Sequence, residues 1–424
     1  MTAPYSRSMR GAVALLVLLT AACTSSGATG AGAPTTSPAA ITSAATAPPT
    51  LPASTTPATS RAASTTTASR ASSATASPAP AAVASAQSVF ARMTERQRVG
   101  QLLMVDCSTT GVSSSTRTAI TQYAVGSVIL DGTSTAGLQA TRTVTARLRS
   151  LAPKIAGLFI STDQEGGLVQ RLQGPGFTRI VSAVVQGTIR PATLQGFAQG
   201  WGSQLRRAGV NVNLAPVLDT VPAGFGSNPP IGNLDREYGR TPAAVTSHGM
   251  AVVRGMTAAG IDVTVKHFPG LGRVRGNTDT TGGVRDTVTT RHDAYLAPFR
   301  AAIAAHVPFV MMSTAIYSRI DARRPAAFSP TIVTGMLRGD LGYRGLVISD
   351  DVGAAAQVAN YSIGDRAVAF VAAGGDMVLT VDANQAGAMT AALLQRASSS
   401  PAFKRLVDAA ALRVLRAKQA RGLL

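Results

Sequence analysis

The chain has 424 residues, and 39 lysines and arginines against 20 aspartates and glutamates give it a formal net charge of +19. A charge of this size favours anionic partners such as cell-wall polymers, although it also fits an arginine-rich composition without a specific partner. The two cysteines, Cys23 and Cys107, exclude a scaffold held together by several disulfides.

The first 22 residues have the pattern of an export signal. Arg7 and Arg10 precede an apolar run at 12–19, which is too short to span a bilayer as a helix. Small residues then lead into Cys23, an arrangement that resembles a bacterial lipoprotein signal. That resemblance implies cleavage after residue 22 and lipidation of Cys23. An ordinary secretory signal is the alternative, so we expect an exported protein, either lipid-anchored at the outer face of the cell membrane or secreted.

Residues 23–87 consist almost entirely of Ala, Ser, Thr, Pro and Gly. This composition cannot bury enough apolar surface to offset the entropy lost on ordering, so we expect a disordered tether. Residues 88–424 then form one large domain. If Cys23 carries the lipid, Cys107 has no partner, and we expect it to be a buried, inert thiol.

Apolar runs of strand length recur along the domain and alternate with amphipathic stretches. We expect strands at 100–107, 126–130, 156–162, 210–217, 262–267, 309–313, 345–349 and 376–380. We expect helices at 138–151, 194–208, 242–258, 293–305, 329–337 and 403–419. Apolar strands that alternate with helices indicate a parallel sheet buried on both faces, and eight such units predict an α/β fold, the single (β/α)8 TIM barrel. A doubly wound open sheet is the alternative, but it would not usually need eight units.

Polar residues gather where five of these strands end. In a TIM barrel the carboxyl ends of the strands form the catalytic face, so the pattern predicts an active site there. The polar groups are at 162–165, Asp219, Lys266 with His267, 313–314 and 349–351.

Five segments, in order, resemble glycoside hydrolase family 3, and most closely its NagZ-type β-N-acetylglucosaminidases. Residues 163–171 are similar to the family's DQEGGRVQR segment, and residues 266–270 match its KHFPG. The other segments are 213–219, 231–239 and 347–351, and residues 94–105 resemble the family's opening strand. With its tether, the chain looks most like the mycobacterial LpqI-type lipoproteins.

The resemblance implies a retaining exo-β-N-acetylglucosaminidase that works through a glycosyl-enzyme intermediate. Such enzymes use a carboxylate nucleophile and a proton donor about 5–5.5 Å away. Asp350 matches the family nucleophile, and Asp351 is the weaker candidate because alternation along a strand would point it elsewhere. The positions that match sugar-binding residues of the family are Asp163, Arg171, Arg236, Lys266 and His267.

These binding residues have structural alternatives. The basic side chains could form salt bridges at the barrel rim, and His267 could be a neutral histidine packed in the barrel. Glu165 is expected to be a structural partner of its loop rather than a catalyst.

The proton donor is where the sequence departs from the family. NagZ-type enzymes carry Asp-Ser-His on the loop after KHFPG, but here the same places hold Asn277, Thr278 and Asp279, and residues 271–283 contain no histidine. We expect Asp279 to act as acid/base if burial keeps its carboxyl protonated. The alternative is that Asp279 only caps a turn. The loop is rich in glycine, which is consistent with a mobile flap over the substrate.

Three functions stay open at this stage. The first is hydrolysis of β-GlcNAc-containing saccharides, such as GlcNAc-MurNAc fragments of peptidoglycan. The second is a phosphorylase, in which Arg273 and Arg275 of the flap attract phosphate. The third is a catalytically weak, wall-glycan-binding lipoprotein. A β-glucosidase or xylosidase is less expected, because those members of the family usually carry a second domain that supplies the acid/base.

The expected partners are few. The four histidines are scattered without ligand spacing, so we expect no metal and no cofactor. An exported enzyme rarely meets nucleic acid, so none is expected as a partner. We expect a monomer whose contacts are the saccharide substrate and, through the lipid anchor, the membrane.

Overall fold

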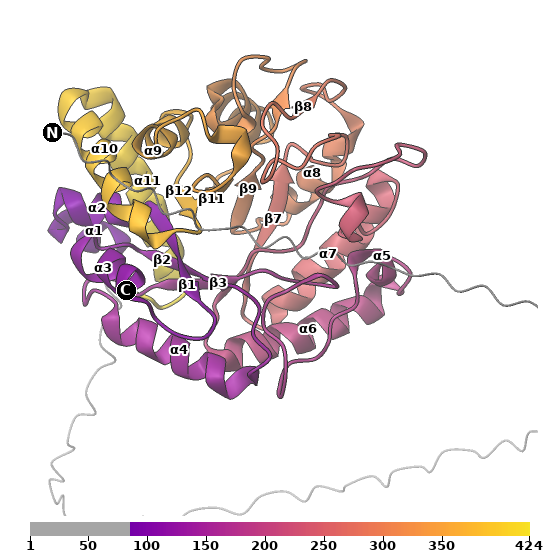
Figure 1. Ribbon diagram of the computed structural model, residues 1–424, viewed down its shortest axis with the longest axis horizontal. Coiled ribbons are helices and arrows are strands. Elements are labelled where there is room, and N and C mark those ends of the chain that lie inside the picture. The colour runs from indigo at the N-terminus through magenta and orange to yellow at the C-terminus, as the bar shows by residue number, and fades with distance from the viewer. Residues whose placement is uncertain (1–84) are drawn as a thin grey trace, which may run out of the picture. The chain divides into compact units, whose positions relative to one another are not determined.

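The computed structural model describes residues 85–424 (Figure 1). The expected signal peptide at 1–22, nearly all of the expected tether at 23–87, and Cys23 lie outside the described residues. None of the helices in the described part is long and apolar enough to cross a membrane.

Eight parallel strands close into a barrel in the order β1-β12-β11-β9-β7-β6-β3-β2 (Figure 1). Each of the eight expected strand regions supplies one of them, so the predicted α/β class and (β/α)8 TIM barrel are confirmed. The strands are β1 (Leu103–Ser108), β2 (Ser127–Asp131), β3 (Phe159–Thr162), β6 (Val212–Asn213), β7 (Asp262–Phe268), β9 (Phe309–Met312), β11 (Leu346–Asp351) and β12 (Met377–Thr380).

Helices surround the barrel. The α-helices are α1 (Ala86–Arg92), α2 (Glu95–Gly100), α3 (Ser114–Gln122), α4 (Gly137–Leu151), α5 (Ala183–Gln186), α6 (Pro191–Ala208), α7 (Pro242–Ala258), α8 (Ala297–Ala304), α9 (Ile363–Ala372), α10 (Ala386–Ser399) and α11 (Pro401–Ala420). Short 3-10 helices are η1 (Gly232–Leu234), η2 (Ala294–Leu296), η3 (Ala326–Phe328), η5 (Ala356–Val358) and η6 (Ala383–Gln385). The helix expected at 329–337 is a π-helix, η4 (Thr331–Asp340).

Two small sheets lie in the loops that follow barrel strands. Strands β4 (Gln164–Gly166) and β5 (Val169–Gln170) pair antiparallel directly after β3. Strands β8 (Arg285–Asp286) and β10 (Ile316–Tyr317) pair in parallel after β7 and β9.

The opening strand is shorter than the sequence suggested. Gly100, the first residue of the expected strand, ends the helix α2 instead, and β1 begins only at Leu103. A capping box explains the difference: Thr94 Oγ1 accepts from Gln97 N at 3.2 Å, and Gln97 Oε1 accepts from Thr94 N at 2.9 Å. These reciprocal bonds satisfy two backbone donors that a starting helix leaves unpaired.

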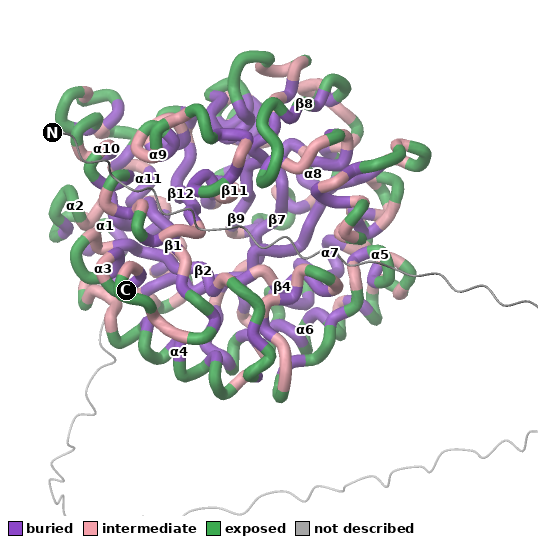
Figure 2. The backbone as a smooth tube through the Cα atoms, in the orientation of Figure 1, coloured by how far each residue is buried: buried purple, intermediate pink, exposed green. Residues whose placement is uncertain are grey.

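The barrel strands are largely buried (Figure 2). Their side chains form one cluster inside the barrel and a larger one between strands and helices. Phe159 and Phe309 meet edge to face inside it, with their ring centroids 5.4 Å apart. Val414 of α11 joins the same cluster, so this last helix packs against the barrel interior. Side chains therefore fill the barrel, and a ligand can bind only at an end or on the outside.

Candidate active site

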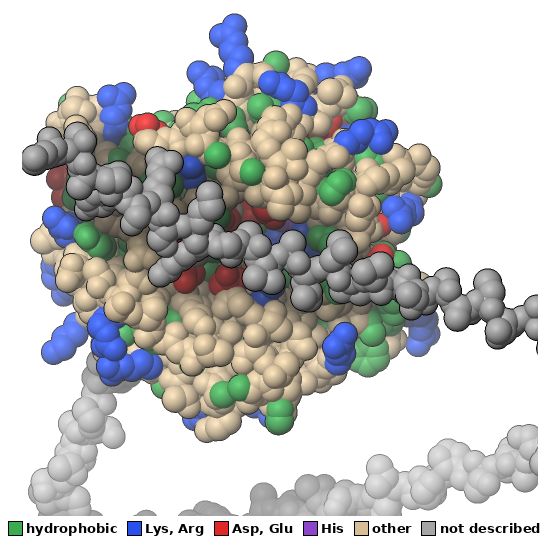
Figure 3. Space-filling view, in the orientation of Figure 1, with side chains coloured by type: hydrophobic (Ala, Val, Ile, Leu, Met, Phe, Trp, Pro, Cys, Tyr) green, Lys and Arg blue, Asp and Glu red, His purple; other side chains and the backbone are tan. Residues whose placement is uncertain are grey.

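A cavity of about 410 Å³ opens at the carboxyl ends of the barrel strands. Acidic side chains gather near the centre of the face shown in Figure 3, whereas most lysines and arginines lie towards its rim. All seven site residues expected from the sequence line this cavity: Asp163, Arg171, Arg236, Lys266, His267, Asp279 and Asp350. Residues from distant parts of the chain thus share one site because their strands end at the same edge.

Asp350 lies near the end of β11, partly exposed to the cavity. Burial raises the pKa of its carboxyl to about 6; the positive environment of His267 and Lys266 opposes the shift, and the charge of Asp279 adds to it. Its Oδ1 accepts from the amide of Asp351 at 2.9 Å. At neutral pH this carboxyl is therefore mostly ionised and lightly hydrogen bonded, as a nucleophile requires.

Asp351 also lines the cavity, which strand alternation did not predict. The pairing of β11 with β12 shifts register between Ile348 and Asp351, so regular alternation is interrupted there. The Asp351 carboxylate accepts three backbone N–H groups, those of Gly353 at 2.8 Å, Ala354 at 3.0 Å and Val381 at 3.1 Å. The two neighbouring carboxylates therefore differ: the Asp351 carboxylate is engaged by three backbone N–H groups, whereas the Asp350 carboxyl accepts from one.

Lys266 lies in a cluster of alternating charge. Its Nζ is 2.5 Å from Asp163 Oδ1 and 2.7 Å from Glu165 Oε1, and its side chain is only 3% exposed. The Arg236 guanidinium donates to both carboxylate oxygens of Glu165, from Nε to Oε2 and from Nη2 to Oε1, each at 2.8 Å. Burial alone would raise the pKa of Glu165, but the charges of Arg236 and Lys266 hold it well below its usual range.

The same cluster keeps its cations charged. Burial would lower the pKa of Lys266, but Asp163 and Glu165 raise it above the ordinary value. Glu165 was expected to serve its own loop, and instead its carboxylate pairs with Arg236 and Lys266 from later segments of the chain. It fixes the position of two predicted sugar-binding residues at once.

His267 is held by Asp219, which the sequence placed at the catalytic face without giving it a role. Its Nδ1 lies 2.6 Å from Oδ2 of Asp219, which is fully buried. The signal for Asp219 was present, because it ends the segment 213–219 and follows a barrel strand. The register of β7 against β9 shifts between Val265 and Phe268, so Lys266 and His267 both reach the cavity although they are consecutive.

Arg171 is held loosely at the rim of the cavity. Its Nε is 3.9 Å from Asp131 Oδ1, and the two side chains are 34% and 39% exposed. An exposed pair at this separation contributes little to stability. Arg171 therefore keeps donors free to face the cavity.

The loop 271–283 is fastened on two sides. Asn228 Nδ2 donates to the carbonyls of Leu271 and Val274, both at 2.9 Å. At the other end, the amides of Ala356 and Gln357 donate to the carbonyls of Asp279 and Thr278, each at 3.0 Å. These bonds hold the loop beside the segment that follows β11, and this contact brings Asp279 near Asp350.

Asp279 lines the cavity but its side chain is exposed, so the expected burial of this carboxyl is wrong. The reason is that the loop lies against its neighbours through backbone atoms. Asn277 caps the turn instead, since its Oδ1 accepts from Asp279 N at 3.0 Å. Within residues 85–424 the Asp279 carboxylate accepts no hydrogen bond, which leaves it available to a ligand.

The two loop arginines that were expected to attract phosphate do not line the cavity. Arg273 pairs with Asp293 at 2.8 Å and stacks on the ring of Tyr295, with 4.2 Å to its centroid. Arg275 lies over Phe225, 4.6 Å from the ring centroid. Both guanidiniums thus stabilise the loop from outside, and the sequence could not show this because the partners are distant in the chain.

Cys107 is buried, as expected, and has no disulfide partner within residues 85–424; burial raises the pKa of its thiol to about 12. Within the part of the chain that the structure describes, no group of three or more His, Cys, Asp and Glu side chains is arranged to hold a metal ion.

Comparison with known proteins agrees with this geometry. Residues 94–417 match the family described as "Glycosyl hydrolase family 3 N terminal domain". A β-hexosaminidase of Stenotrophomonas maltophilia (strain R551-3) is 34% identical over 286 residues, which are 66% of this chain and 82% of that protein.

Solved structures give the same family. The β-N-acetylhexosaminidase of Beutenbergia cavernae DSM 12333 is 48% identical with a TM-score of 0.76, covering 77% of this chain and 98% of that one. LpqI of M tuberculosis is 27% identical with a TM-score of 0.67, covering 78% and 96% of the two chains. The chain therefore belongs to glycosyl hydrolase family 3 and, within it, to the NagZ-type β-N-acetylhexosaminidases, which are glycoside hydrolases.

Proposed function

We propose that the protein is a retaining exo-β-N-acetylglucosaminidase that acts on glycan fragments derived from the peptidoglycan of the cell wall. The observation that carries the proposal is the environment of Asp350, an ionisable carboxyl in a cavity whose only hydrogen bond within residues 85–424 is to the next amide. In the first step, Asp350 attacks the anomeric carbon and the glycosidic bond breaks. Water then releases the sugar from the glycosyl-enzyme.

Five residues are proposed to hold the terminal sugar. Lys266 has three donors, of which Asp163 and Glu165 engage two, so one remains for a hydroxyl. His267 donates through Nδ1 to Asp219, and its Nε2 is left for the substrate. Asp163, Arg171 at the rim and Arg236 from the buried charge cluster complete the set of charged partners for hydroxyl and acetamido groups.

Asp279 is proposed as the acid/base. It would give a proton to the leaving oxygen in the first step and take one from water in the second. Its place in the cavity, its lack of a hydrogen-bond partner for the carboxyl among residues 85–424 and its closeness to Asp350 support this role. Because the side chain is exposed, solvent can reach it between turnovers.

The proposed location follows from the N-terminal pattern. We infer that the domain is exported and held at the outer face of the membrane by a lipid on Cys23. Secretion after cleavage of the signal is the alternative. Either location would bring the cavity to wall fragments that carry terminal β-linked GlcNAc. Metabolic labelling with a radioactive fatty acid tests the anchor, and a Cys23→Ser chain that still takes up label would contradict it.

Release of 4-nitrophenol from its β-N-acetylglucosaminide tests the activity. We expect turnover by the full-length chain and its loss in Asp350→Asn. Asp351→Asn is the matched control, because it changes the adjacent carboxylate, which holds backbone amides. The control should lower the melting temperature and keep turnover in its folded fraction. An active Asp350→Asn would remove Asp350 from the mechanism.

Product analysis separates the proposal from its alternatives. With GlcNAc-MurNAc and added inorganic phosphate, hydrolysis gives free GlcNAc, whereas phosphorolysis gives GlcNAc 1-phosphate. The positions of Arg273 and Arg275 outside the cavity remove the feature that suggested phosphorolysis. Saccharide binding by a folded chain that turns over neither substrate would instead support the wall-binding function.

A further inference from the structure

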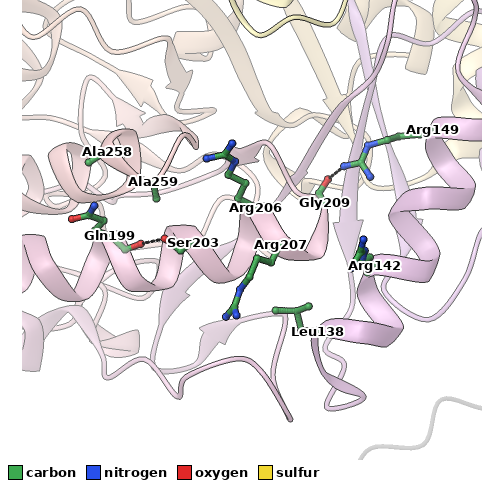
Figure 4. A pocket seen from close by; sticks show the side chains of 10 residues that line it. All are labelled: Leu138, Arg142, Arg149, Gln199, Ser203, Arg206, Arg207, Gly209, Ala258 and Ala259. Carbon is green, nitrogen blue, oxygen red and sulfur yellow. Dashed lines mark hydrogen bonds between the residues drawn. The ribbon is translucent and has the colours of Figure 1, made fainter.

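A larger cavity, of about 650 Å³, lies on the outside of the barrel between α4, α6 and the end of α7 (Figure 4). Four arginines line it, together with small and neutral residues, and we call it the arginine groove. Arg142 and Arg149 come from α4, and Arg206 and Arg207 come from α6. The other lining residues are Leu138, Gln199, Ser203, Gly209, Ala258 and Ala259.

The charges of the groove are not neutralised by the protein. No carboxylate lines it, and within residues 85–424 none of its four arginines is paired with an acidic side chain. All four are exposed, and the one hydrogen bond that their side chains donate runs from Arg149 to the carbonyl of Gly209. Burial and the nearby charge of Arg142 lower the pKa of Arg149. Four like charges in one cavity repel each other, which disfavours the arrangement without an anion.

Helix ends explain only part of this arrangement. Arg149, Arg206 and Arg207 lie in the last turns of α4 and α6, where a cation interacts favourably with the helix dipole. The dipole does not account for Arg142, which lies in the middle of α4. Nor does it explain why two helices place arginines around one cavity that no carboxylate lines. Arg396, in the last turn of α10, occupies the same kind of position but does not line the arginine groove.

We propose that the arginine groove binds a ligand that carries two or more phosphate groups in a chain. A guanidinium is a planar fork of donors that matches phosphate oxygens in pairs, and it is always charged. The Gln199 side chain adds a neutral donor, and Ser203, whose hydroxyl donates to the Gln199 carbonyl at 2.8 Å, leaves room for the chain together with Gly209, Ala258 and Ala259. The concave shape favours a threaded polyanion over a flat anionic surface.

The groove is separate from the candidate active site. Gly209 ends α6 three residues before β6 begins, so the groove reaches the amino ends of the strands, whereas Asp350 lies at a carboxyl end. A neighbouring cavity of about 360 Å³ shares Arg149 and Arg206 and continues to Arg421. An anion bound here leaves the catalytic cavity open, so this proposal does not depend on the proposed function.

Titration calorimetry of the full-length chain with sodium tripolyphosphate at low ionic strength tests the proposal. We expect binding that weakens with added salt, and an affinity about tenfold lower in the double variant Arg142→Gln/Arg206→Gln. Neither side chain makes a hydrogen bond or ion pair among the described residues, so the variant should fold. The matched control is Arg396→Gln, which removes a charge from a helix end outside the groove and should bind like the wild type.

Other outcomes would overturn the proposal. Equal affinity in the wild type and the double variant would place the anion elsewhere. Inorganic phosphate that binds as tightly as tripolyphosphate would show a site for one phosphate only. Suppose the chain does not bind tripolyphosphate but binds vesicles with anionic lipid, and this binding requires the groove arginines. The groove would then be a membrane contact. Release of 4-nitrophenol should be the same in the double variant and the wild type.

Discussion

Asp219 holds His267 at two points. Its Oδ2 lies 2.6 Å from Nδ1 of the ring, and its Oδ1 accepts from the amide of His267 at 3.1 Å. The same Oδ1 accepts from the amide of Leu271 at 2.7 Å, at the start of the loop that carries Asp279. One buried carboxylate therefore sets both the orientation of the histidine and the path of the loop.

Asp219→Asn should lower kcat/KM by about 10- to 100-fold, a size typical of residues that orient a functional histidine. A carboxylate accepts from Nδ1–H, whereas an amide nitrogen facing the ring would favour the other tautomer. Steady-state kinetics on the 4-nitrophenyl substrate measures the effect. The control is Asp286→Asn, since Asp286 is also fully buried and caps a turn, but outside the cavity. Equal kinetic losses in the two variants would show that Asp219 is only structural.

Much of the fold is predictable from the sequence because its signals are local. Apolar runs that alternate with amphipathic stretches were enough for eight strands and six helical segments, whereas α3, α9 and α10 were not predicted. Local rules also shape the difference: the Thr94 capping box starts α2, which runs to Gly100, the first residue of the expected strand. The π-helical turns of η4 have no comparable signature, since helical spacing alone does not separate them from an α-helix.

The sequence predicts which residues line the cavity but not how they pair with one another. Strand ends share one edge of a barrel, so polar residues there had to converge. The pairing of Glu165 with Arg236 and Lys266 joins segments about 70 to 100 residues apart, and no local pattern specifies it. The exposure of Asp279 is not predictable for the same reason, because it depends on where the loop lies against η5.

The rate should fall on the acid side as Asp350 becomes protonated. Its pKa is raised to about 6, and only the ionised form attacks the anomeric carbon. We therefore expect log kcat/KM to be constant near neutral pH, where Asp350 is ionised, and to decline with a slope of about one below pH 6. A profile from pH 4 to 8, with recovery of activity after each acid exposure, measures this. An acid limb centred near pH 4 would show a carboxyl in an ordinary environment.

Asp350→Asn should make the folded protein more stable at neutral pH. The folded pKa is raised above the unfolded one, so the folded state binds more protons between about pH 4 and 6, and wild-type stability falls as pH rises through that window. Above pH 6 the wild-type carboxyl is ionised and destabilises the folded state most. There the free energy of unfolding of the variant should exceed that of the wild type by about 1 to 3 kcal/mol. Melting temperatures at pH 7.5 and pH 4 measure the difference, which should shrink at the lower pH. A variant that melts below the wild type at pH 7.5 would contradict this.

Asp279→Asn should slow substrates according to their leaving groups. If Asp279 protonates the leaving oxygen, a 4-nitrophenyl substrate needs little help, whereas GlcNAc-MurNAc should lose about 100- to 10,000-fold. Comparing kcat/KM for the two substrates measures this. The control is Asp235→Asn, an exposed aspartate that does not line the cavity. Equal losses on both substrates would give Asp279 a role in binding and leave the proton donor to another group.

Lys418 should make stability depend on pH at the alkaline side. It is fully buried beneath the barrel, where its Nζ donates to Gln101 Oε1 at 2.6 Å and to the carbonyl of Gly126 at 2.8 Å. Burial lowers its pKa to about 7, so between pH 7 and 10 the unfolded state binds more protons than the folded one. Wild-type stability gains from this group as pH rises through that window.

Lys418→Met removes the titration, and the free energy of unfolding of the wild type minus that of the variant should therefore increase from pH 7 to pH 10. The slope of this difference cannot exceed about 1.4 kcal/mol per pH unit for one group. Urea unfolding at several pH values measures it, and the subtraction cancels the other titrating groups. Lys404→Met, at a side chain 41% exposed, is the control and should give a flat difference. A flat difference for Lys418→Met as well would mean that the buried lysine keeps its charge in the folded protein.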